Sequence, residues 1–356
     1  MTRSEKLFFS VQSKADAILI CSPINQLYYT GFAHTDGYTL ITKNNCYLIT
    51  DFRYIESAKN EAEKEFNIVL FKGLNDGTVK ELLVKNKIKK LMFEDSFLTV
   101  SQYEKMKSIF TDVSFVPAER IIEDMREYKS DSEAECIIKA QRIAEKAFDD
   151  LISSFDKNAT EKEIAAHLEY LMKKNGADKI SFDTIAVSGK ASSLPHGVPR
   201  DKKIENGFLT LDFGAVYKGY HSDMTRTLCI GKADAYMKKV YSTVLTAQNT
   251  AIQAIIDGER NCFTIDKIAR DIINNSGFEG CFGHGLGHGV GLEIHEAPRL
   301  SLSCDKNKTL QTGHIVTVEP GIYIENMYGV RIEDMIYMSE KGPVNITKTP
   351  KNLIEL

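Results

Sequence analysis

The sequence predicts an α+β protein of two domains, the first of which is a smaller α/β domain. The chain has 356 residues, more than a single hydrophobic core usually accommodates. Strand-like and helix-like segments alternate up to about residue 125, and a strand-rich region with long helical patterns follows. A polar stretch over residues 127–132 separates the two parts. We therefore predict an N-terminal domain at residues 1–127 and a C-terminal domain at residues 128–356.

The predicted elements of the N-terminal domain are short. Apolar runs of strand-forming residues predict strands at residues 17–21, 38–42, 46–50 and 90–93. The second and third of these, separated by Lys-Asn-Asn, should form a β-hairpin. Helical patterns predict helices at residues 78–85 and 101–109. No cluster of potential metal ligands occurs in this domain, so we expect the chemistry elsewhere.

The C-terminal domain should contain long helices at residues 133–155, 161–175, 233–257 and 265–275. Either Ser130 or Ser132 would cap the first helix, whose early acidic residues favour the helix dipole. Thr160 would cap the second helix, and Gly176 would end it. All of the candidate catalytic residues lie in this domain.

A predicted β-hairpin brings two aspartates together. Residues 208–216 and 220–230 have the composition of strands, and the segment 217–219 supplies a tight turn with a glycine. With a two-residue loop after residue 216, Asp212 would directly face Asp223. Like charges facing each other across two strands, with Cβ atoms roughly 4.5–5.5 Å apart, are destabilising. A sequence that keeps both aspartates there therefore predicts a bound cation.

A glycine-rich segment at residues 283–295 contains three histidines, His284, His288 and His295. Repeated glycine permits close backbone approach, as expected where a chain wraps around a site. Imidazole is the commonest nitrogen ligand of metals in proteins. The cluster therefore indicates a metal or catalytic site, but its spacing does not identify the histidine that binds a metal.

Two glutamates in apolar strand patterns complete the set. The pattern at residues 316–324 is interrupted at Glu319-Pro-Gly, a bend that could aim the carboxylate inward. In the next strand pattern, alternation puts Arg331 and Glu333 on one face and Asp334 on the other. Four carboxylates and one histidine suit Mn-like or Zn-like divalent ions. Two bridged metals activate water for hydrolysis, so the residues predict a dinuclear metallohydrolase.

Composition excludes several other classes of protein. A net charge of −4 gives no reason to expect nucleic acid or an anionic membrane as a partner. The N-terminal residues lack the apolar core of a signal peptide, and no apolar stretch reaches the length of a membrane span. The seven cysteines are scattered without CxxC pairs, which favours reduced thiols over a zinc-thiolate site. We therefore expect a cytoplasmic protein.

The C-terminal domain resembles the pita-bread metallopeptidases, which include methionine aminopeptidase, aminopeptidase P and prolidase. The matching motifs lie at residues 211–214, 221–227, 283–296, 318–321 and 331–334. The N-terminal domain is similar to the creatinase-type domain of the proline-specific members, at residues 25–31 and 48–54. The resemblance thus implies a pita-bread fold with a creatinase-type N-terminal domain. The extra domain and the segment 194–197, Leu-Pro-His-Gly, favour the proline-specific branch.

The resemblance also implies a role for each ligand. Asp212 would chelate one metal ion, Asp223 and Glu333 would bridge both, and His288 and Glu319 would bind the other. The two divalent ions are expected to be Mn, with Co, Zn or Fe as alternatives.

Further roles follow from the same motifs. Glu319 would also act as the proton shuttle between the attacking water and the leaving amine. His196, His284 and His295 match pocket histidines, which would orient the substrate and stabilise the oxyanion. Arg331 would either bind a substrate carboxylate or brace Glu333 through a salt bridge, and we favour bracing.

The expected activity is hydrolysis of the peptide bond between an N-terminal residue and proline. We favour an aminopeptidase that also accepts dipeptides, acting on peptides with proline in the second position. The alternatives are a strict prolidase, a metal-free hydrolase like creatinase, and a non-catalytic peptide-binding relative. A homodimer is the family expectation.

Overall fold

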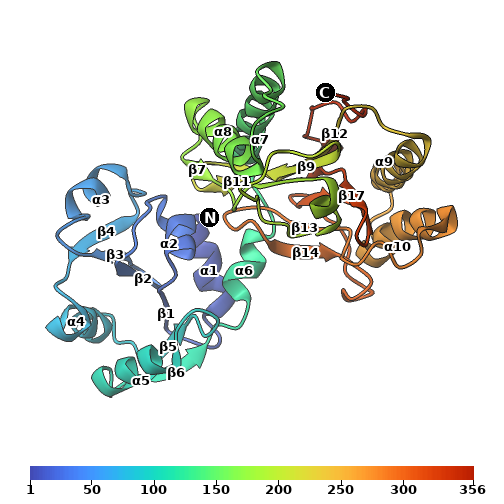
Figure 1. The fold of residues 1–356 in the computed structure, drawn as a ribbon. Coiled ribbons are helices and arrows are strands. Elements are labelled where there is room, and N and C mark those ends of the chain that lie inside the picture. The colour runs from blue at the N-terminus through green and yellow to red at the C-terminus, as the bar shows by residue number, and fades with distance from the viewer. The chain divides into compact units, whose positions relative to one another are not determined.

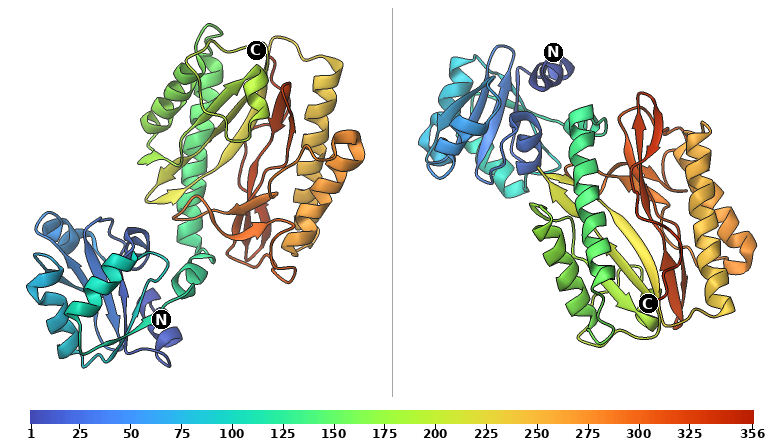
Figure 2. Two further views of the ribbon diagram at one scale, coloured as in Figure 1. Left: turned by 60° about the horizontal axis from the view of Figure 1, so that its bottom comes forward. Right: turned by 90° about the horizontal axis from the view of Figure 1, so that it is seen from above.

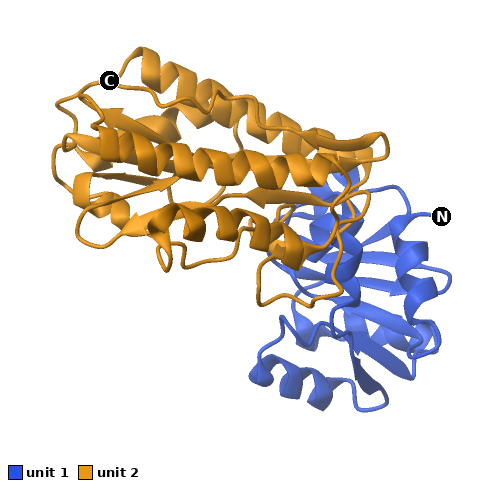
Figure 3. Cartoon of the chain, turned by 90° about the vertical axis from the view of Figure 1, so that its right-hand side faces the viewer, with its two compact units in different colours: residues 1–126 blue, residues 127–356 orange.

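The computed structural model describes all 356 residues and divides them into two compact units. Unit 1 comprises residues 1–126 and unit 2 comprises residues 127–356 (Figure 3). Each unit has its own hydrophobic core, and each is described by itself below. No helix in either unit combines the length and apolar character needed to cross a bilayer.

Unit 1 is built on one six-stranded sheet with the strand order β4-β3-β2-β1-β5-β6 (Figure 1). The strands are β1 (Ala17–Ile20), β2 (Gly37–Thr42), β3 (Cys46–Thr50), β4 (Phe66–Leu70), β5 (Lys90–Phe93) and β6 (Ser114–Pro117). Strand β2 pairs antiparallel with β1 and β3, and the other neighbours are parallel. The predicted strands and the predicted hairpin are confirmed.

The helices of unit 1 bury apolar side chains against this sheet. They are α1 (Arg3–Val11), α2 (Pro23–Thr30), α3 (Ile55–Glu61), the short 3₁₀ turn η1 (Leu74–Asp76), α4 (Thr78–Lys85), α5 (Val100–Ile109) and α6 (Ile121–Arg126). The predicted α4 has the observed bounds, and α5 begins one residue earlier than predicted. Leu83 of α4 and Met106 of α5 pack with Leu19 and Ile49 of the strands. This burial holds the layers together.

Unit 2 places its strands between two pairs of helices. In Figure 2 the pair α7 (Asp131–Ser153) and α8 (Glu161–Lys174) covers one side, and α9 (Ala235–Ile256) with α10 (Cys262–Ile273) covers the other. Two short helical turns, η2 (Gly189–Ser193) and η3 (Asn274–Phe278), complete the helical content. Ser130 and Thr160 cap α7 and α8 in capping boxes, as predicted for Thr160 and for one of the two serines.

The strands of unit 2 form four small sheets rather than one large one. Three strands follow the order β11-β10-β7, three follow β12-β9-β8, five follow β14-β13-β15-β18-β19, and β16 pairs with β17. The strands are β7 (Lys179–Ile180), β8 (Ile185–Ser188), β9 (Gly207–Phe213), β10 (Ala215–Tyr217), β11 (Tyr220–His221), β12 (Met224–Ile230), β13 (Gly287–Gly289), β14 (Glu296–Leu300), β15 (Ile315–Val318), β16 (Gly321–Ile324), β17 (Tyr328–Arg331), β18 (Asp334–Ser339) and β19 (Gly342–Asn345).

The predicted register of the aspartate hairpin is wrong by two residues. Tyr217 pairs with Tyr220, so the loop consists of Lys218 and Gly219. Both loop residues have positive φ, 50° and 82°, as a type I′ turn requires. Asp212 consequently pairs with Thr225 and not with Asp223. Because the displacement is even, the face on which the side chains lie is unchanged.

Strand patterns that seem continuous in the sequence are interrupted in the structure. Gly214 separates β9 from β10, and a Cβ there would lie 1.9 Å from the Ser222 carbonyl oxygen. Residues 222–223 separate β11 from β12, and residues 332–333 separate β17 from β18. The break at residues 319–320, between β15 and β16, is the only one of these that the sequence predicted.

Candidate metal centre and active site

The five predicted metal ligands come from five different segments of unit 2. Asp212 lies in β9 and His288 in β13. Asp223 precedes β12, Glu319 follows β15, and Glu333 precedes β18. Three of the acidic residues therefore stand at strand breaks, where the side chain can leave the regular alternation of the ladder.

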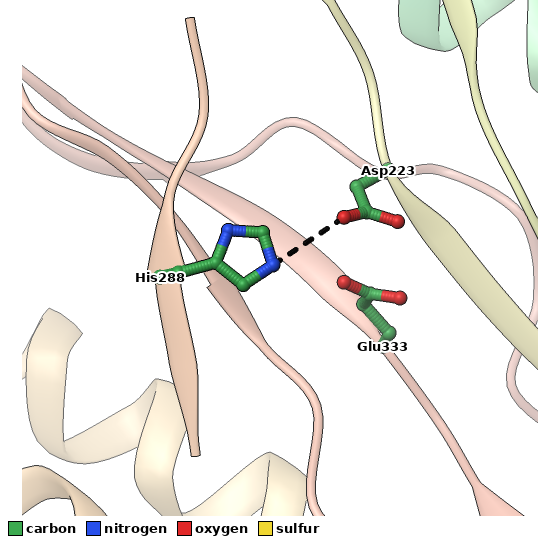
Figure 4. Close-up of side chains that lie close together, drawn as sticks. All are labelled: Asp223, His288 and Glu333. Atoms are coloured by element: carbon green, nitrogen blue, oxygen red, sulfur yellow. Dashed lines mark ion pairs between the residues drawn. The ribbon is translucent and has the colours of Figure 1, made fainter. Parts of the chain in front are cut away.

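The structure brings Asp223, His288 and Glu333 together. One ligand atom from each lies within 4.8 Å of the others, and all three residues are buried (Figure 4). His288 Nε2 is 3.5 Å from Asp223 Oδ2 and 3.4 Å from Glu319 Oε1. In Figure 4 the imidazole of His288 projects from its strand toward the carboxylates of Asp223 and Glu333. Three of the five predicted ligands thus form one cluster, and Glu319 adjoins it through His288.

Asp212 joins the cluster through Arg331. The Arg331 guanidinium donates to Asp212 Oδ2 at 2.6 Å through Nη2 and to Thr225 Oγ1 at 3.1 Å through Nε. The Thr225 hydroxyl in turn donates to Glu333 Oε2 at 2.7 Å. The predicted salt bridge between Arg331 and Glu333 is therefore not formed. Because Thr225 and not Asp223 faces Asp212 across the ladder, Arg331 contacts one acid directly and reaches the other through a hydroxyl group.

Burial and mutual repulsion raise the pKa values of the clustered acids. The pKa of Asp223 is raised well above its usual value by desolvation and by the charges of Glu333 and Asp212. Desolvation together with the charges of Glu319 and Asp212 does the same to Glu333. Desolvation raises the pKa of Glu319 to about 7. So many carboxylates can ionise together only beside a positive charge larger than that of Arg331.

Two buried oxygen atoms in the cluster have no hydrogen-bond partner. They are Asp212 Oδ1 and Glu333 Oε1. Buried polar atoms are almost always satisfied, so each such exception needs an explanation. Oxygen ligands from four carboxylates, together with one imidazole nitrogen, fit divalent ions of the Mn or Zn type. The residues present therefore fit a centre of two divalent ions, and the unpartnered oxygens are its natural ligand atoms.

His288 is held as a neutral imidazole. Its Nδ1–H donates to the Gly289 carbonyl oxygen at 3.0 Å, which leaves the lone pair of Nε2 directed at the carboxylates. Desolvation lowers the pKa of His288 to about 3. An imidazole whose other nitrogen donates to a backbone carbonyl is the usual arrangement of a metal-binding histidine.

The cluster opens into a cavity of about 770 Å³, a volume within the range of small-molecule sites. The predicted pocket histidines His196, His284 and His295 all line it, together with the five predicted ligands and Arg331. The apolar part of the wall consists of Phe182, Ile185, Pro195, Val198 and Ile294. The structure thus collects every predicted site residue around one cavity.

Three residues of the site were missed in the sequence. Tyr323 OH lies 2.9 Å from His284 Nε2 and accepts from Arg331 Nη1 at 2.7 Å. Thr225 links Arg331 to Glu333, and Arg299 lines the cavity. Alternation along β16 would have placed Tyr323 on the same face as Gly321, close to Glu319. For Thr225 and Arg299, no sequence signal distinguishes them from ordinary strand residues.

Comparison with known proteins identifies the family of the chain. The model of metallopeptidase family M24 matches residues 135–340, and the creatinase/prolidase N-terminal domain matches residues 10–128. The chain is 39% identical to the Xaa-Pro dipeptidase of Pyrococcus furiosus over 355 residues, which cover 99% of each chain.

Solved structures agree with this assignment. The Xaa-Pro dipeptidase of Bacillus anthracis has a TM-score of 0.92 and 40% identity, covering 99% of both chains. The X-Pro aminopeptidase of Thermotoga maritima has a TM-score of 0.92 and 37% identity, covering 99% of this chain and 100% of that one. The predicted pita-bread fold with a creatinase-type N-terminal domain is confirmed. The chain belongs to metallopeptidase family M24.

Proposed function

We propose that this protein is a two-metal peptidase that cleaves the bond between an N-terminal residue and proline. The observation that carries the proposal is the cluster of buried acids with two unpartnered oxygens beside a neutral histidine. The cluster forms one wall of a cavity large enough for a short peptide. Relatives at about 40% identity that span the whole chain include Xaa-Pro dipeptidases and an X-Pro aminopeptidase.

The five ligands have distinct roles in this proposal. Asp212 would chelate one ion, His288 and Glu319 would hold the other, and Asp223 and Glu333 would be shared between the two. When bound, such a pair of ions activates water at neutral pH and polarises the scissile carbonyl. We infer Mn as the native metal because the ligand set is rich in carboxylates, with Co, Zn or Fe as alternatives.

The protein's own groups manage the protons and the developing charge. Glu319 is suited to accept a proton from the attacking water and pass it to the leaving amine, because its carboxylate lines the cavity and lies 3.4 Å from His288 Nε2. His196, His284 and His295 line the cavity and orient the substrate carbonyl. The Arg331 guanidinium donates to Tyr323, Asp212 and Thr225, and through these bonds it holds the Asp212 carboxylate and the Thr225 hydroxyl in place.

A strict dipeptidase is the second candidate function, and Arg299 favours it. Its exposed guanidinium lines the cavity and has no ion-pair or hydrogen-bond partner in the structure. Desolvation is the main cause that lowers the pKa values of His288 and His295, and the charge of Arg299 adds to this lowering. An unpaired cation at that position could bind the free carboxylate of a dipeptide.

Matched kinetics on Ala-Pro and Ala-Pro-Ala with defined metals test the proposal and separate the two candidates. We expect hydrolysis of both peptides by the Mn-loaded protein and none after chelation. Hydrolysis of Ala-Pro alone would favour the dipeptidase. In that case Arg299→Met should raise KM for Ala-Pro by about tenfold or more, the loss expected for one charge-assisted pair. Absence of activity with every metal would reject both.

We also infer a cytoplasmic homodimer in which residues 128–356 carry the chemistry and residues 1–127 form the accessory domain. The seven cysteines are all free in the structure, which agrees with a reducing compartment. Sedimentation of the purified protein tests the dimer, and a monomer would reject it.

A further inference from the structure

The loop that carries His295 closes around a buried carboxylate that has no role in the proposed chemistry. Glu296 directly follows His295 and begins β14, and its side chain is 5% exposed. Glu296 Oε1 accepts a hydrogen bond from the Glu293 N–H at 3.1 Å. A Cβ on Gly291 would lie 2.3 Å from Glu296 Oε2, so only glycine permits this approach. The loop of residues 291–296 is therefore shaped by the carboxylate inside it.

This loop forms part of the cavity wall. Ile294 and His295 both line the cavity. The His295 ring lies 4.5 Å from the ring of His288, at an angle of 79°. The start of the loop is tied to the hairpin that precedes Asp223, because the His221 N–H donates to the Gly291 carbonyl oxygen at 2.8 Å. A displacement of the loop would therefore move His295 relative to His288.

Lys129 carries the charge that faces Glu296. Its Nζ donates to Glu296 Oε2 at 2.8 Å and to the Glu127 carbonyl oxygen at 3.2 Å. The Lys129 side chain is 2% exposed, so the pair is almost completely desolvated. Removing one partner of such a pair leaves an uncompensated buried charge, which is strongly unfavourable.

The segment that bears Lys129 is itself anchored. The Lys129 N–H donates to the Gly313 carbonyl oxygen at 2.8 Å. Next to it the Tyr128 ring packs on the His314 ring with centroids 4.8 Å apart, and Lys308 Nζ lies 2.7 Å from Glu127 Oε2. Because its backbone is fixed, Lys129 presents its ammonium group to the loop from a defined position.

We propose that Lys129 and Glu296 are positioning residues for His295, an inference that rests on the proposed function. Stability alone does not account for the pair, since a buried ion pair is commonly no more stable than apolar residues of similar volume. Unlike an apolar contact, the pair is directional. One oxygen of the Glu296 carboxylate accepts from the Lys129 ammonium group, and the other accepts from the loop backbone. The first residues of unit 2 thereby set the geometry of the cavity wall.

Kinetics of single and double variants test this positioning role. We expect Lys129→Met and Glu296→Gln each to lower kcat on Ala-Pro by about tenfold to 100-fold, with a smaller change in KM, because a small misplacement costs this much. In a His295→Ala background, Lys129→Met should lower kcat by no more than about twofold further, since residues acting through one group are not additive. Independent, multiplying losses would overturn the proposal, as would an unchanged kcat in Lys129→Met.

Glu145→Gln is the matched control. Glu145 is a buried carboxylate of unit 2 that pairs with Arg142 and accepts from the Lys348 N–H, and neither it nor its partners line the cavity. Its kcat should equal that of the wild type. If Lys129→Met fails to fold, the double variant Lys129→Met/Glu296→Gln removes both charges and avoids an unpaired one. It should show the same loss in kcat.

A readout that is independent of activity separates this inference from the proposed function. Hydrogen exchange of the peptide covering residues 290–296 should be at least about tenfold faster in Lys129→Met than in the wild type or in Glu145→Gln. Bound metal should stay at the wild-type level. Unchanged exchange would reject the positioning role even in an active enzyme. An inactive wild type with altered exchange in the variant would reject only the proposed function.

Discussion

Unit 1 and unit 2 both bury acidic side chains, but they satisfy them differently. In unit 1, Glu94 is 2% exposed and accepts hydrogen bonds from the backbone of Cys21 and Ser22 and from the Asn25 side chain. In unit 2, Glu333 is 1% exposed, and its Oε1 has no partner. Burial raises the pKa of both groups. The raised pKa is therefore common to both acids, whereas the unsatisfied oxygen distinguishes Glu333 from Glu94.

The two units also differ in the continuity of their strands. In unit 1, strands β1, β2, β3 and β5 agree with the apolar runs that predicted them. Several strands of unit 2 break next to an acidic residue of the candidate metal centre. A regular ladder directs side chains alternately to two faces, and a break releases a side chain from that alternation. In unit 2 the candidate catalytic residues therefore lie at the breaks between strands.

The largest expected effect comes from a bridging acid. Glu333→Gln should lower kcat/KM on Ala-Pro by more than about 100-fold, beyond the loss seen for outer-sphere residues, and should remove bound metal. In the metal-free protein the same change should raise Tm, because it deletes a repelled buried charge. Calorimetry with and without chelator checks both signs. Retained metal with full activity would contradict the bridging role.

The Thr225 hydroxyl should matter next. Thr225→Val removes the group that accepts from Arg331 and donates to Glu333 while keeping the shape of the side chain. We expect metal affinity to fall by about 10-fold to 100-fold. Titration of the metal-free protein with Mn measures it. Thr243→Val, a change at a hydroxyl that donates to a backbone carbonyl in α9, is the matched control and should bind metal normally.

The pH dependence of stability in the metal-free protein should disappear when metal is bound. The folded-state pKa of Glu319 is about 7, above its ordinary value of 4.5, and those of Asp223 and Glu333 are also raised. A raised folded pKa stabilises the protein fully below the ordinary value, and this stabilisation is lost as pH rises through the folded value. Metal-free protein should therefore lose Tm between about pH 4.5 and about pH 7. Calorimetry across this range should show no such loss after saturation with Mn.

Glu94→Gln should have the smallest effect on function and so completes the comparison between the units. Glutamine has one acceptor oxygen where Glu94 has two, so an amide oxygen that accepts from the Cys21 and Ser22 N–H groups leaves its NH₂ group facing the Asn25 NH₂ donor. We therefore expect a loss of about 1–3 kcal/mol in the free energy of unfolding. Urea denaturation measures this loss. Metal content and kcat should remain at wild-type values, and a loss of metal in this variant would remove the distinction drawn here.

The sequence motifs correctly predicted which residues line the site, whereas the spacing of the hairpin residues gave the wrong strand register. Asp212, Asp223 and the glycine-rich histidine segment were recognisable because acids and histidines in apolar or glycine-rich segments need a reason to be there. The register of the hairpin was predicted two residues out, because it depends on Lys218 adopting a positive φ of 50°, which its residue type does not favour. The predicted salt bridge between Arg331 and Glu333 was wrong because the Thr225 hydroxyl accepts from Arg331 and donates to Glu333.

By itself, the sequence determined the residue types of the centre, the two-part organisation, and most helices and strands, because composition and periodicity are local properties. The tertiary structure alone decided which oxygens remain unpartnered, that Tyr323 contacts His284 and Arg331, that Arg299 lines the cavity, and that Lys129 faces Glu296. These features depend on contacts between residues up to 167 positions apart. Such contacts depend on how whole segments pack against one another, and local sequence patterns do not predict this packing.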